Sequence, residues 1–222
     1  MTLRLSTNTN LSLFTSNQYK GNPVYTKRGA LVESYLEGCA ATLARALTAY
    51  PKTCAIRIDL RFPINAVKTD EAAISRFIAS LKAQIKADQL SSIKNIKIQR
   101  VHPCDLRFVW TREKNTALYH HYHVLLLLNG HAYNCLGDYS ATEGNMAARI
   151  KKAWASAIGV PLAELGGGIF FTENPTYVLN ANDPDLIFKE AYQSLFFRVS
   201  YFAKVATKQY GQKIRHFGCS RS

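Results

Sequence analysis

The order of hydrophobic and polar positions changes its period several times along the chain. Residues 55–62 read AIRIDLRF, with apolar side chains at every second position and charged ones between them. A period of two is typical of a strand with one buried face, so a strand is expected here. Residues 120–128 read HHYHVLLLL, and their apolar run predicts a strand buried on both faces. Further strands are expected at 95–101 and 106–113.

Other segments repeat their apolar residues with the period of a helix. Such spacing predicts helices at 30–48, 71–88, 143–158 and about 186–208. GGGIFF and TYVLN flank TENP and are expected to form a short hairpin, with a tight turn at GGG. The first 25 residues are rich in Ser, Thr and Asn without periodicity, so we expect an arm or loop.

This mixed order of strands and helices predicts an α+β fold. We expect a largely antiparallel central sheet with helices packed on one face. The apolar sides of the strands, with Phe108, Trp110, Tyr122 and Val124, should meet those helices. We divide the chain into an N-terminal arm and helix, residues 1–50, and a main domain, residues 51–222.

The charge of the chain favours a polyanionic partner. Its 222 residues include 28 Lys and Arg against 15 Asp and Glu, a net charge of +13. Nucleic acid or an anionic membrane surface would complement this excess. No apolar run approaches the roughly 20 residues of a membrane span, and no basic helix has an aromatic apolar face. Nucleic acid is therefore the expected partner, and no membrane association is expected.

Cysteine usage and the N-terminus bear on location. The five cysteines are scattered without a CxxC pair, which indicates reduced thiols rather than disulfides or a cysteine zinc site. The N-terminus has no long apolar segment followed by a small-residue cleavage site, so no signal peptide is expected. We expect a cytoplasmic protein.

Candidate chemistry begins with the histidines of HHYH. His121 and His123 lie two residues apart on a strand and therefore share a face. The preceding strand ends at Glu113, and a register that pairs Glu113 with His121 would bring all three side chains together. Two imidazoles and a carboxylate can hold a divalent ion. The other interpretation is that the histidines are hydrogen-bonded surface groups at a strand end.

A second cluster of candidates follows on the last expected helix. Spacings of three, three and four place Arg198, Tyr201, Lys204 and Lys208 on one helical face. An ammonium beside a phenol favours the phenolate and can hold a phosphate oxygen. With a metal ion opposite, Tyr201 would suit phosphodiester transfer. An ordinary tyrosine on an amphipathic surface helix would give the same pattern.

The ordered motifs resemble a known superfamily. HYH on a central strand followed by YFAK on a later helix resembles the HUH endonucleases, which initiate rolling-circle replication. More narrowly, four stretches over roughly residues 50–222 are similar to the inovirus and prophage replication-initiator family with its YagK/YfjJ-type domain: FVWTREKN…HYHVLLLLNG, KKAWASAIG, YFAK and IRHFGCSR. The sheet implied by this resemblance is HUH/RRM-like.

The resemblance implies single-strand nicking at a replication origin of a filamentous phage or prophage. His121 and His123 would be metal ligands, with Glu113 as the third. Tyr201 would be the nucleophile, leaving a 5′-phosphotyrosine and a free 3′-OH, and Lys204 would assist it. Phe197 occupies the place of the second tyrosine of two-tyrosine members, which implies a single-tyrosine type.

Oxygen-rich phosphate sites favour Mg²⁺ or Mn²⁺ as the cofactor, and two imidazoles shift the choice toward Mn²⁺. Single-stranded origin DNA and a host helicase are the implied partners. Arg57 and Arg61 alternate onto the expected face of the histidines, and Arg198 and Lys208 flank Tyr201, so we predict that these four contact the DNA backbone. Two alternatives are a non-catalytic nucleic-acid-binding phage regulator and a metal-dependent phosphoesterase that uses water, with Tyr201 structural.

Overall fold

A five-stranded antiparallel sheet forms the centre of the computed structural model, which describes residues 3–95, 100–114, 118–208, 210 and 214–221. The strand order is β10 (Phe217–Cys219), β7 (Arg107–Glu113), β8 (His121–Asn129), β6 (Lys52–Leu60) and β9 (Ile169–Asn180). Every neighbouring pair is antiparallel. The expected α+β class and antiparallel sheet are therefore confirmed.

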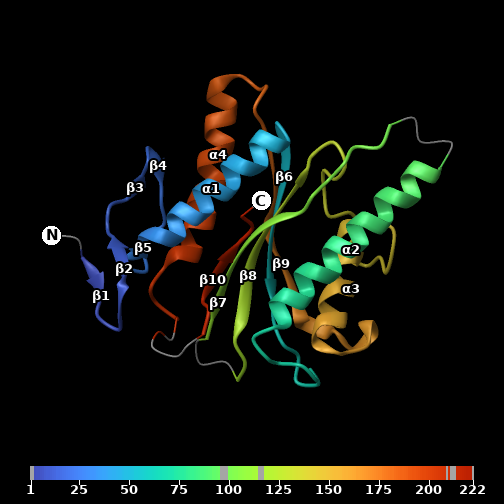
Figure 1. The fold of residues 1–222 in the computed structure, drawn as a ribbon, viewed down its shortest axis with the longest axis horizontal. Coiled ribbons are helices and arrows are strands. Elements are labelled where there is room, and N and C mark those ends of the chain that lie inside the picture. The colour runs from blue at the N-terminus through green and yellow to red at the C-terminus, as the bar shows by residue number, and fades with distance from the viewer. Residues whose placement is uncertain (1–2, 96–99, 115–117, 209, 211–213, 222) are drawn as a thin grey trace.

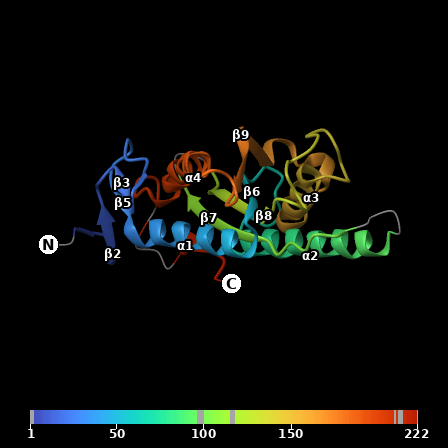
Figure 2. The ribbon, with the colours of Figure 1, turned by 90° about the horizontal axis from the view of Figure 1, so that it is seen from above.

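Helices cover both faces of this sheet, not one as expected (Figures 1 and 2). On one face lie α2 (Ala73–Lys94) and α3 (Met146–Ile158), packed on the side chains that include Trp110 and Tyr122. On the other lie α1 (Glu33–Ala49) and α4 (Asp185–Ser200). The physical reason lies in β8, whose consecutive leucines point to both faces and so need an apolar layer on each side.

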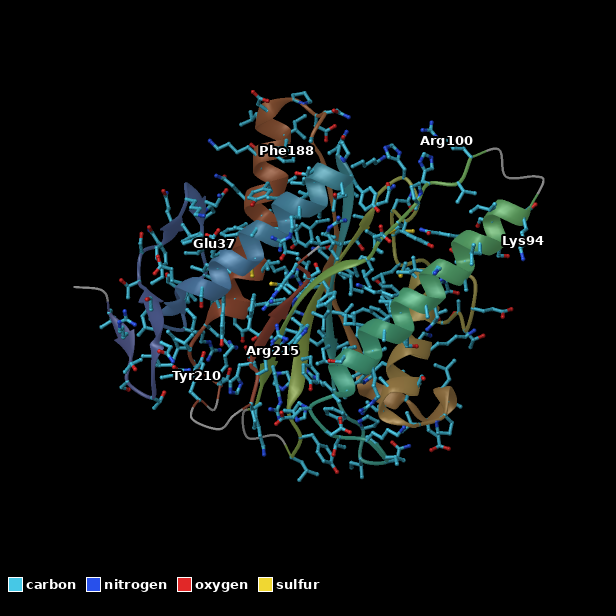
Figure 3. All side chains as sticks on the ribbon, viewed as in Figure 1. Glu37, Lys94, Arg100, Phe188, Tyr210 and Arg215 are labelled. Carbon is cyan, nitrogen blue, oxygen red and sulfur yellow. The ribbon has the colours of Figure 1, made fainter. Side chains whose placement is uncertain are left out.

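Side chains from both helical layers fill the space up to the sheet (Figure 3). The α1/α4 layer and the sheet share one hydrophobic cluster, which includes Leu36, Leu43, Leu125 and Leu127. Consequently α1, which belongs to the segment we divided off as residues 1–50, packs in the same core as the main sheet.

Short strands occupy much of the N-terminal region that was expected to be an arm or loop. They are β1 (Arg4–Leu5), β2 (Asn8–Phe14), β3 (Gln18–Tyr19), β4 (Asn22–Pro23) and β5 (Leu31–Val32). β1, β2 and β5 form one small sheet, and β3 pairs with β4. None of the helices among the described residues is long and apolar enough to cross a membrane.

The expected hairpin around TENP is wrong, because residues 169–180 form the single long strand β9 along β6. The register shifts between Ile56 and Ile58 of β6, so that β9 bulges at residues 172–175. Asn174 has a φ of 46°, a left-handed conformation that asparagine tolerates better than most residues. The GGG segment is a 3-10 turn, η2 (Gly166–Gly168), which follows η1 (Leu162–Glu164). The strand expected at 95–101 lies largely on residues 96–99, outside the described part of the chain.

The last helix is shorter than its periodicity predicts. α4 ends at Ser200, a 3-10 turn η3 (Tyr201–Ala203) follows, and Lys204 is already extended with a ψ of 141°. Lys204 forms a β-bridge with Leu31, and the Val205 N–H donates to the Ala30 carbonyl over 3.2 Å. The segment around Ala30 and Leu31 thus lies beside the end of α4. By pairing with Lys204 and Val205, it directs the chain after η3 away from the helix axis.

Candidate metal and tyrosine site

The register of three strands brings the predicted ligands together. Glu113 of β7 pairs with His121 of β8, as the metal-site hypothesis requires. His123 lies between Thr111 of β7 and Asp59 of β6. Ligand atoms of Glu113, His121 and His123 lie within 4.8 Å of one another. The convergence expected from the sequence is therefore confirmed.

Asp59 orients the buried His123. The Nδ1 atom of His123 donates to the Asp59 carboxylate over 2.6 Å, and Nε2 lies 3.3 Å from Oε2 of Glu113. Burial alone would raise the pKa of Asp59, but the hydrogen bond from His123 and the nearby Arg57 lower it to about 2. An ionised Asp59 fixes the proton on Nδ1 and leaves Nε2 for a metal, which is how carboxylates commonly position metal-binding histidines.

Arg57 also approaches His123, with Nη2 2.9 Å from Nδ1. One Nδ1 proton cannot be donated to Asp59 while the same atom accepts from Arg57. We assign the proton to the contact with Asp59, since that pair is shorter and its acceptor is charged.

His121 is neutral at physiological pH. Its burial, reinforced by the neighbouring His123, lowers the pKa of His121 to about 4. The two imidazole rings lie 4.9 Å apart between centroids and meet edge to face. A neutral imidazole has a free lone pair, so His121 can act as a ligand without first losing a proton.

Glu113 is a buried carboxylate with one oxygen satisfied and one free. Oε2 accepts from Nζ of Lys204 at 2.7 Å and from Oγ1 of Thr207 at 2.8 Å. Within the described part of the chain Oε1 has no hydrogen-bond partner, and Nζ of Lys208 forms an ion pair with it at 3.6 Å. Burial would raise the pKa of Glu113, but the neighbouring His123, Lys208 and Lys204 hold it well below its usual range.

A divalent ion fits this donor set. The buried Oε1 of Glu113 makes an ion pair with Lys208 but has no hydrogen-bond partner among the described residues, so it can still accept a ligand bond. Two imidazole nitrogens with one carboxylate suit a first-row transition ion such as Mn²⁺ better than Mg²⁺, which prefers oxygen ligands. Three protein ligands also leave positions open for a substrate oxygen.

Tyr201 is tied to the same group through Lys204. The Lys204 ammonium is 3 % exposed and donates to the Tyr201 hydroxyl while it also holds Glu113. The Tyr201 ring lies 5.7 Å from the His123 ring. A single ammonium thus separates the phenol oxygen from the carboxylate of the candidate metal site.

The Tyr25 ring packs against Tyr201. Tyr25 lies 5.4 Å from the Tyr201 ring and 5.8 Å from Phe197, both edge to face. The Tyr25 N–H donates to Oγ of Ser200 over 2.8 Å, which attaches the N-terminal segment to the end of α4. The contact restricts where the Tyr201 ring can lie.

Two of the four residues predicted to contact the DNA backbone, Arg57 and Lys208, are buried rather than presented on a basic surface. Arg57 is 6 % exposed and donates to Asp59 and to the Ile58 carbonyl. Lys208 is also buried and donates to the Lys204 carbonyl. The helical face on which Lys204 and Lys208 were placed does not exist, because the chain leaves the helix and both ammonium groups turn toward Glu113.

The other two predicted DNA contacts lie nearer the surface. Arg61 is exposed and lies over the ring of Phe170, 5.7 Å from guanidinium carbon to centroid. Arg198 is half-buried and donates to the carbonyls of Glu173 and Asn174 in the β9 bulge.

Tyr122, between the two histidines, belongs to the opposite face. It is buried against α2 and α3, and its hydroxyl lies 2.9 Å from Nε2 of His120. Arg112 approaches the other ring nitrogen of His120 at 3.1 Å. This network satisfies the Tyr122 hydroxyl inside the core.

Three residues of the site were not singled out from the sequence. Asp59 could have been identified from the sequence, because it is the acid between Arg57 and Arg61 on one face of the strand expected beside the histidines. No sequence pattern points to Thr207 or Tyr25. Thr207 reaches the site through the path of the chain after Ser200, and Tyr25 through the path of the segment before α1.

Comparison with known proteins agrees with the motifs. The YagK/YfjJ C-terminal domain family matches residues 14–220. The chain is 34% identical over 207 residues to the uncharacterized protein YfjJ of Escherichia coli strain K12, covering 87% of this chain and 96% of YfjJ. It is 35% identical over 181 residues to the uncharacterized protein YagK of the same strain, covering 78% and 85%. No solved structure matches the chain significantly. The chain belongs to the YagK/YfjJ C-terminal domain family.

Proposed function

We propose that this protein is a rolling-circle replication initiator of the HUH type, from a filamentous phage or prophage. It would nick and rejoin single-stranded DNA through Tyr201. The observation that carries the proposal is the Lys204 ammonium, which contacts both the Tyr201 hydroxyl and the Glu113 carboxylate beside two histidines.

The reaction is a transesterification at one phosphodiester. The Tyr201 oxygen attacks phosphorus, a Tyr–O–P bond forms and the P–O3′ bond breaks. The phenol gives its proton to solvent, and the departing 3′-oxygen takes one up, so no proton is consumed overall. Attack by a 3′-OH on the 5′-phosphotyrosine reverses these changes and joins the DNA.

Each group of the site has a role in this reaction. Lys204 stabilises the phenolate and draws a phosphate oxygen toward Tyr201. His121, His123 and Glu113 would hold a divalent ion, which supplies charge neutralisation and orientation of the phosphate. Asp59 keeps His123 in the tautomer that can bind. A cytoplasmic location and cooperation with a host helicase complete the proposal.

The test is covalent capture of DNA. Protein, Mn²⁺ and a library of random single-stranded oligonucleotides would be resolved by denaturing electrophoresis, and the adduct peptide identified by mass spectrometry. We expect an adduct on Tyr201 that is lost in Tyr201→Phe, because only the attacking oxygen is removed. Tyr192→Phe and Tyr210→Phe are matched controls that should retain it.

The other outcomes separate the alternatives. An adduct that persists in Tyr201→Phe would move the nucleophile to another residue. Cleavage without any adduct would indicate a phosphoesterase that uses water. Tight binding of the oligonucleotides with neither adduct nor cleavage would support the non-catalytic regulator, which the net charge of +13 also suits. Loss of nicking in the double variant His121→Ala, His123→Ala would support the metal assignment.

A further inference from the structure

A row of paired residues leads from the candidate metal site to the edge of the sheet. His123 of β8 pairs with Asp59 of β6, and Asp59 pairs with Phe170 of β9. Directly opposed residues on antiparallel strands point to the same face. Phe170 therefore lies on the face of His123, two strands away or about 10 Å.

The Phe170 ring is open to solvent. It is 50% exposed, and among the described strands β9 lies at the edge of the sheet, next to β6. The exposed Arg61 lies against the ring at 5.7 Å. Other large apolar side chains are also exposed, but the Phe170 ring packs against the Arg61 guanidinium and lies next to the candidate site of phosphate transfer.

The backbone that carries Phe170 is held in place. Arg198 of α4 donates to the Glu173 carbonyl at 2.7 Å and to the Asn174 carbonyl at 3.2 Å. From the other side, Thr172 donates to the Arg57 carbonyl at 3.2 Å. The bulge that follows Phe170 is thus fixed at both sides, so the ring is presented from a rigid support rather than from a loose loop end. Preorganisation of this kind lowers the entropy lost on binding.

An exposed aromatic face beside a guanidinium suits one class of ligand. Unpaired nucleobases stack on aromatic rings and on arginine planes, and the adjoining phosphates bind the positive charge. A base pair within a duplex is already stacked on both sides and cannot cover the ring without being unstacked. The arrangement therefore favours single-stranded over double-stranded DNA.

We propose that Phe170 is the stacking platform for the base of one nucleotide next to the scissile phosphate, and that Arg61 binds a phosphate of the same strand. The inference rests on the proposed function and extends it to a DNA-binding subsite at the β9 edge. Arg198 acts as a positioning residue for this platform, since its charge is directed to the bulge carbonyls.

The experiment measures binding in a Tyr201→Phe background, where no adduct forms. Fluorescence anisotropy would follow a labelled oligo(dT) in the presence of Mn²⁺. Phe170→Ala should weaken binding by about 5- to 100-fold, as expected for one lost stacking contact, and leave the salt dependence unchanged. Arg61→Ala should lower the slope of log K against log salt by about 0.7, because it removes one phosphate contact.

Three variants and one ligand serve as controls. Phe170→Trp should bind as the parent, and Phe170→Leu, which keeps apolar bulk without a π face, should bind as Phe170→Ala. Val178→Ala changes an exposed apolar residue on the opposite face of the same strand and should have no effect. An oligonucleotide of abasic sites should bind equally to the parent and to Phe170→Ala, since it offers phosphates without bases.

The outcomes separate the two proposals. A parent protein that binds no single-stranded DNA overturns the proposed function itself. A parent that binds, with Phe170→Ala equal to it, overturns the platform alone. The platform is equally overturned if Phe170→Leu binds as the parent, if Val178→Ala loses as much affinity as Phe170→Ala, or if the Phe170→Ala loss persists on the abasic strand.

Discussion

The Asp59→Asn substitution tests whether the orientation of His123 governs metal binding. Asp59 is 6 % exposed, accepts from Nδ1 of His123 at 2.6 Å and pairs with Arg57. Asparagine has nearly the same shape and still offers an oxygen, so the geometry is largely retained. What it removes is the negative charge that fixes the Nδ1 proton and makes Nε2 more basic.

The size of the effect follows from that difference. Loss of an outer partner of a metal-binding histidine typically lowers metal affinity by about 10- to 100-fold, or roughly 1.4–2.7 kcal/mol. Because asparagine preserves a neutral hydrogen bond, we expect the lower half of this range. Nicking should fall in the same proportion at limiting Mn²⁺ and recover at saturating Mn²⁺. Tyr201→Phe should not recover under any metal concentration.

The assay is isothermal titration of Mn²⁺ into each variant. Glu113→Gln, which removes a proposed ligand, should lose more affinity than Asp59→Asn, and the exposed Glu143→Gln is the matched control with no expected change. Circular dichroism and thermal melting would show whether each variant is folded. An unchanged Mn²⁺ affinity in folded Asp59→Asn would refute the argument that Asp59 prepares His123 for a metal.

The acid stability of the protein gives a second measure of Asp59. Its pKa of about 2 in the folded state lies below the ordinary value of 3.8. A lowered carboxyl pKa contributes stability that is present above the ordinary value and is lost as the pH falls toward the folded one. Between about pH 4 and 2 the wild type should therefore lose stability more steeply than Asp59→Asn, as followed by urea unfolding.

Two further predictions concern the residues around Tyr201. Burial lowers the pKa of Lys208 from 10.5 to about 8, so between these pH values the unfolded chain binds more protons than the folded one. The contribution of Lys208 to the free energy of unfolding should therefore rise with pH across this window. Urea unfolding at pH 7–10.5 should show that Lys208→Met lacks this slope. Tyr25→Ala should slow formation of the Tyr201 adduct by about tenfold, or about 1.4 kcal/mol, because the Tyr201 ring becomes less ordered, and it should leave the Mn²⁺ affinity unchanged. Tyr25→Phe should keep both the rate and the Mn²⁺ affinity of the wild type. An unchanged rate in Tyr25→Ala would exclude a positioning role for Tyr25.

The convergence of the three predicted metal ligands could be expected from the sequence because their geometry is local. A short connection joins β7 to β8, and the period of two then decides which side chains share a face. With Glu113 opposite His121, the rest of the constellation follows from the register. The leucine run predicted that β8 is buried on both faces, but we expected helices on one face of the sheet only, whereas each face needs its own layer.

The tyrosine end of the site could not be placed in the same way. The spacing of Arg198, Tyr201, Lys204 and Lys208 is helical, and local propensity gives no reason for α4 to stop at Ser200. Tertiary contacts end the helix. The Val205 N–H donates to the Ala30 carbonyl, and the ammonium groups of Lys204 and Lys208 form ion pairs with Glu113. The hairpin at TENP failed for a related reason, because pairing along β6 outweighed the local turn signal.

The charges buried around Glu113 are an argument for an anionic ligand. Each buried ion costs several kcal/mol unless it is compensated by partners of opposite sign. Within the described residues, the ion pairs of this group set the carboxylates Asp59 and Glu113 against the cations Arg57, Lys204 and Lys208. A positive charge is left over, and a bound divalent ion would add two more. A site built only to hold a structural metal would gain nothing from a third cation, whereas a DNA phosphate beside Tyr201 would offset part of this positive charge.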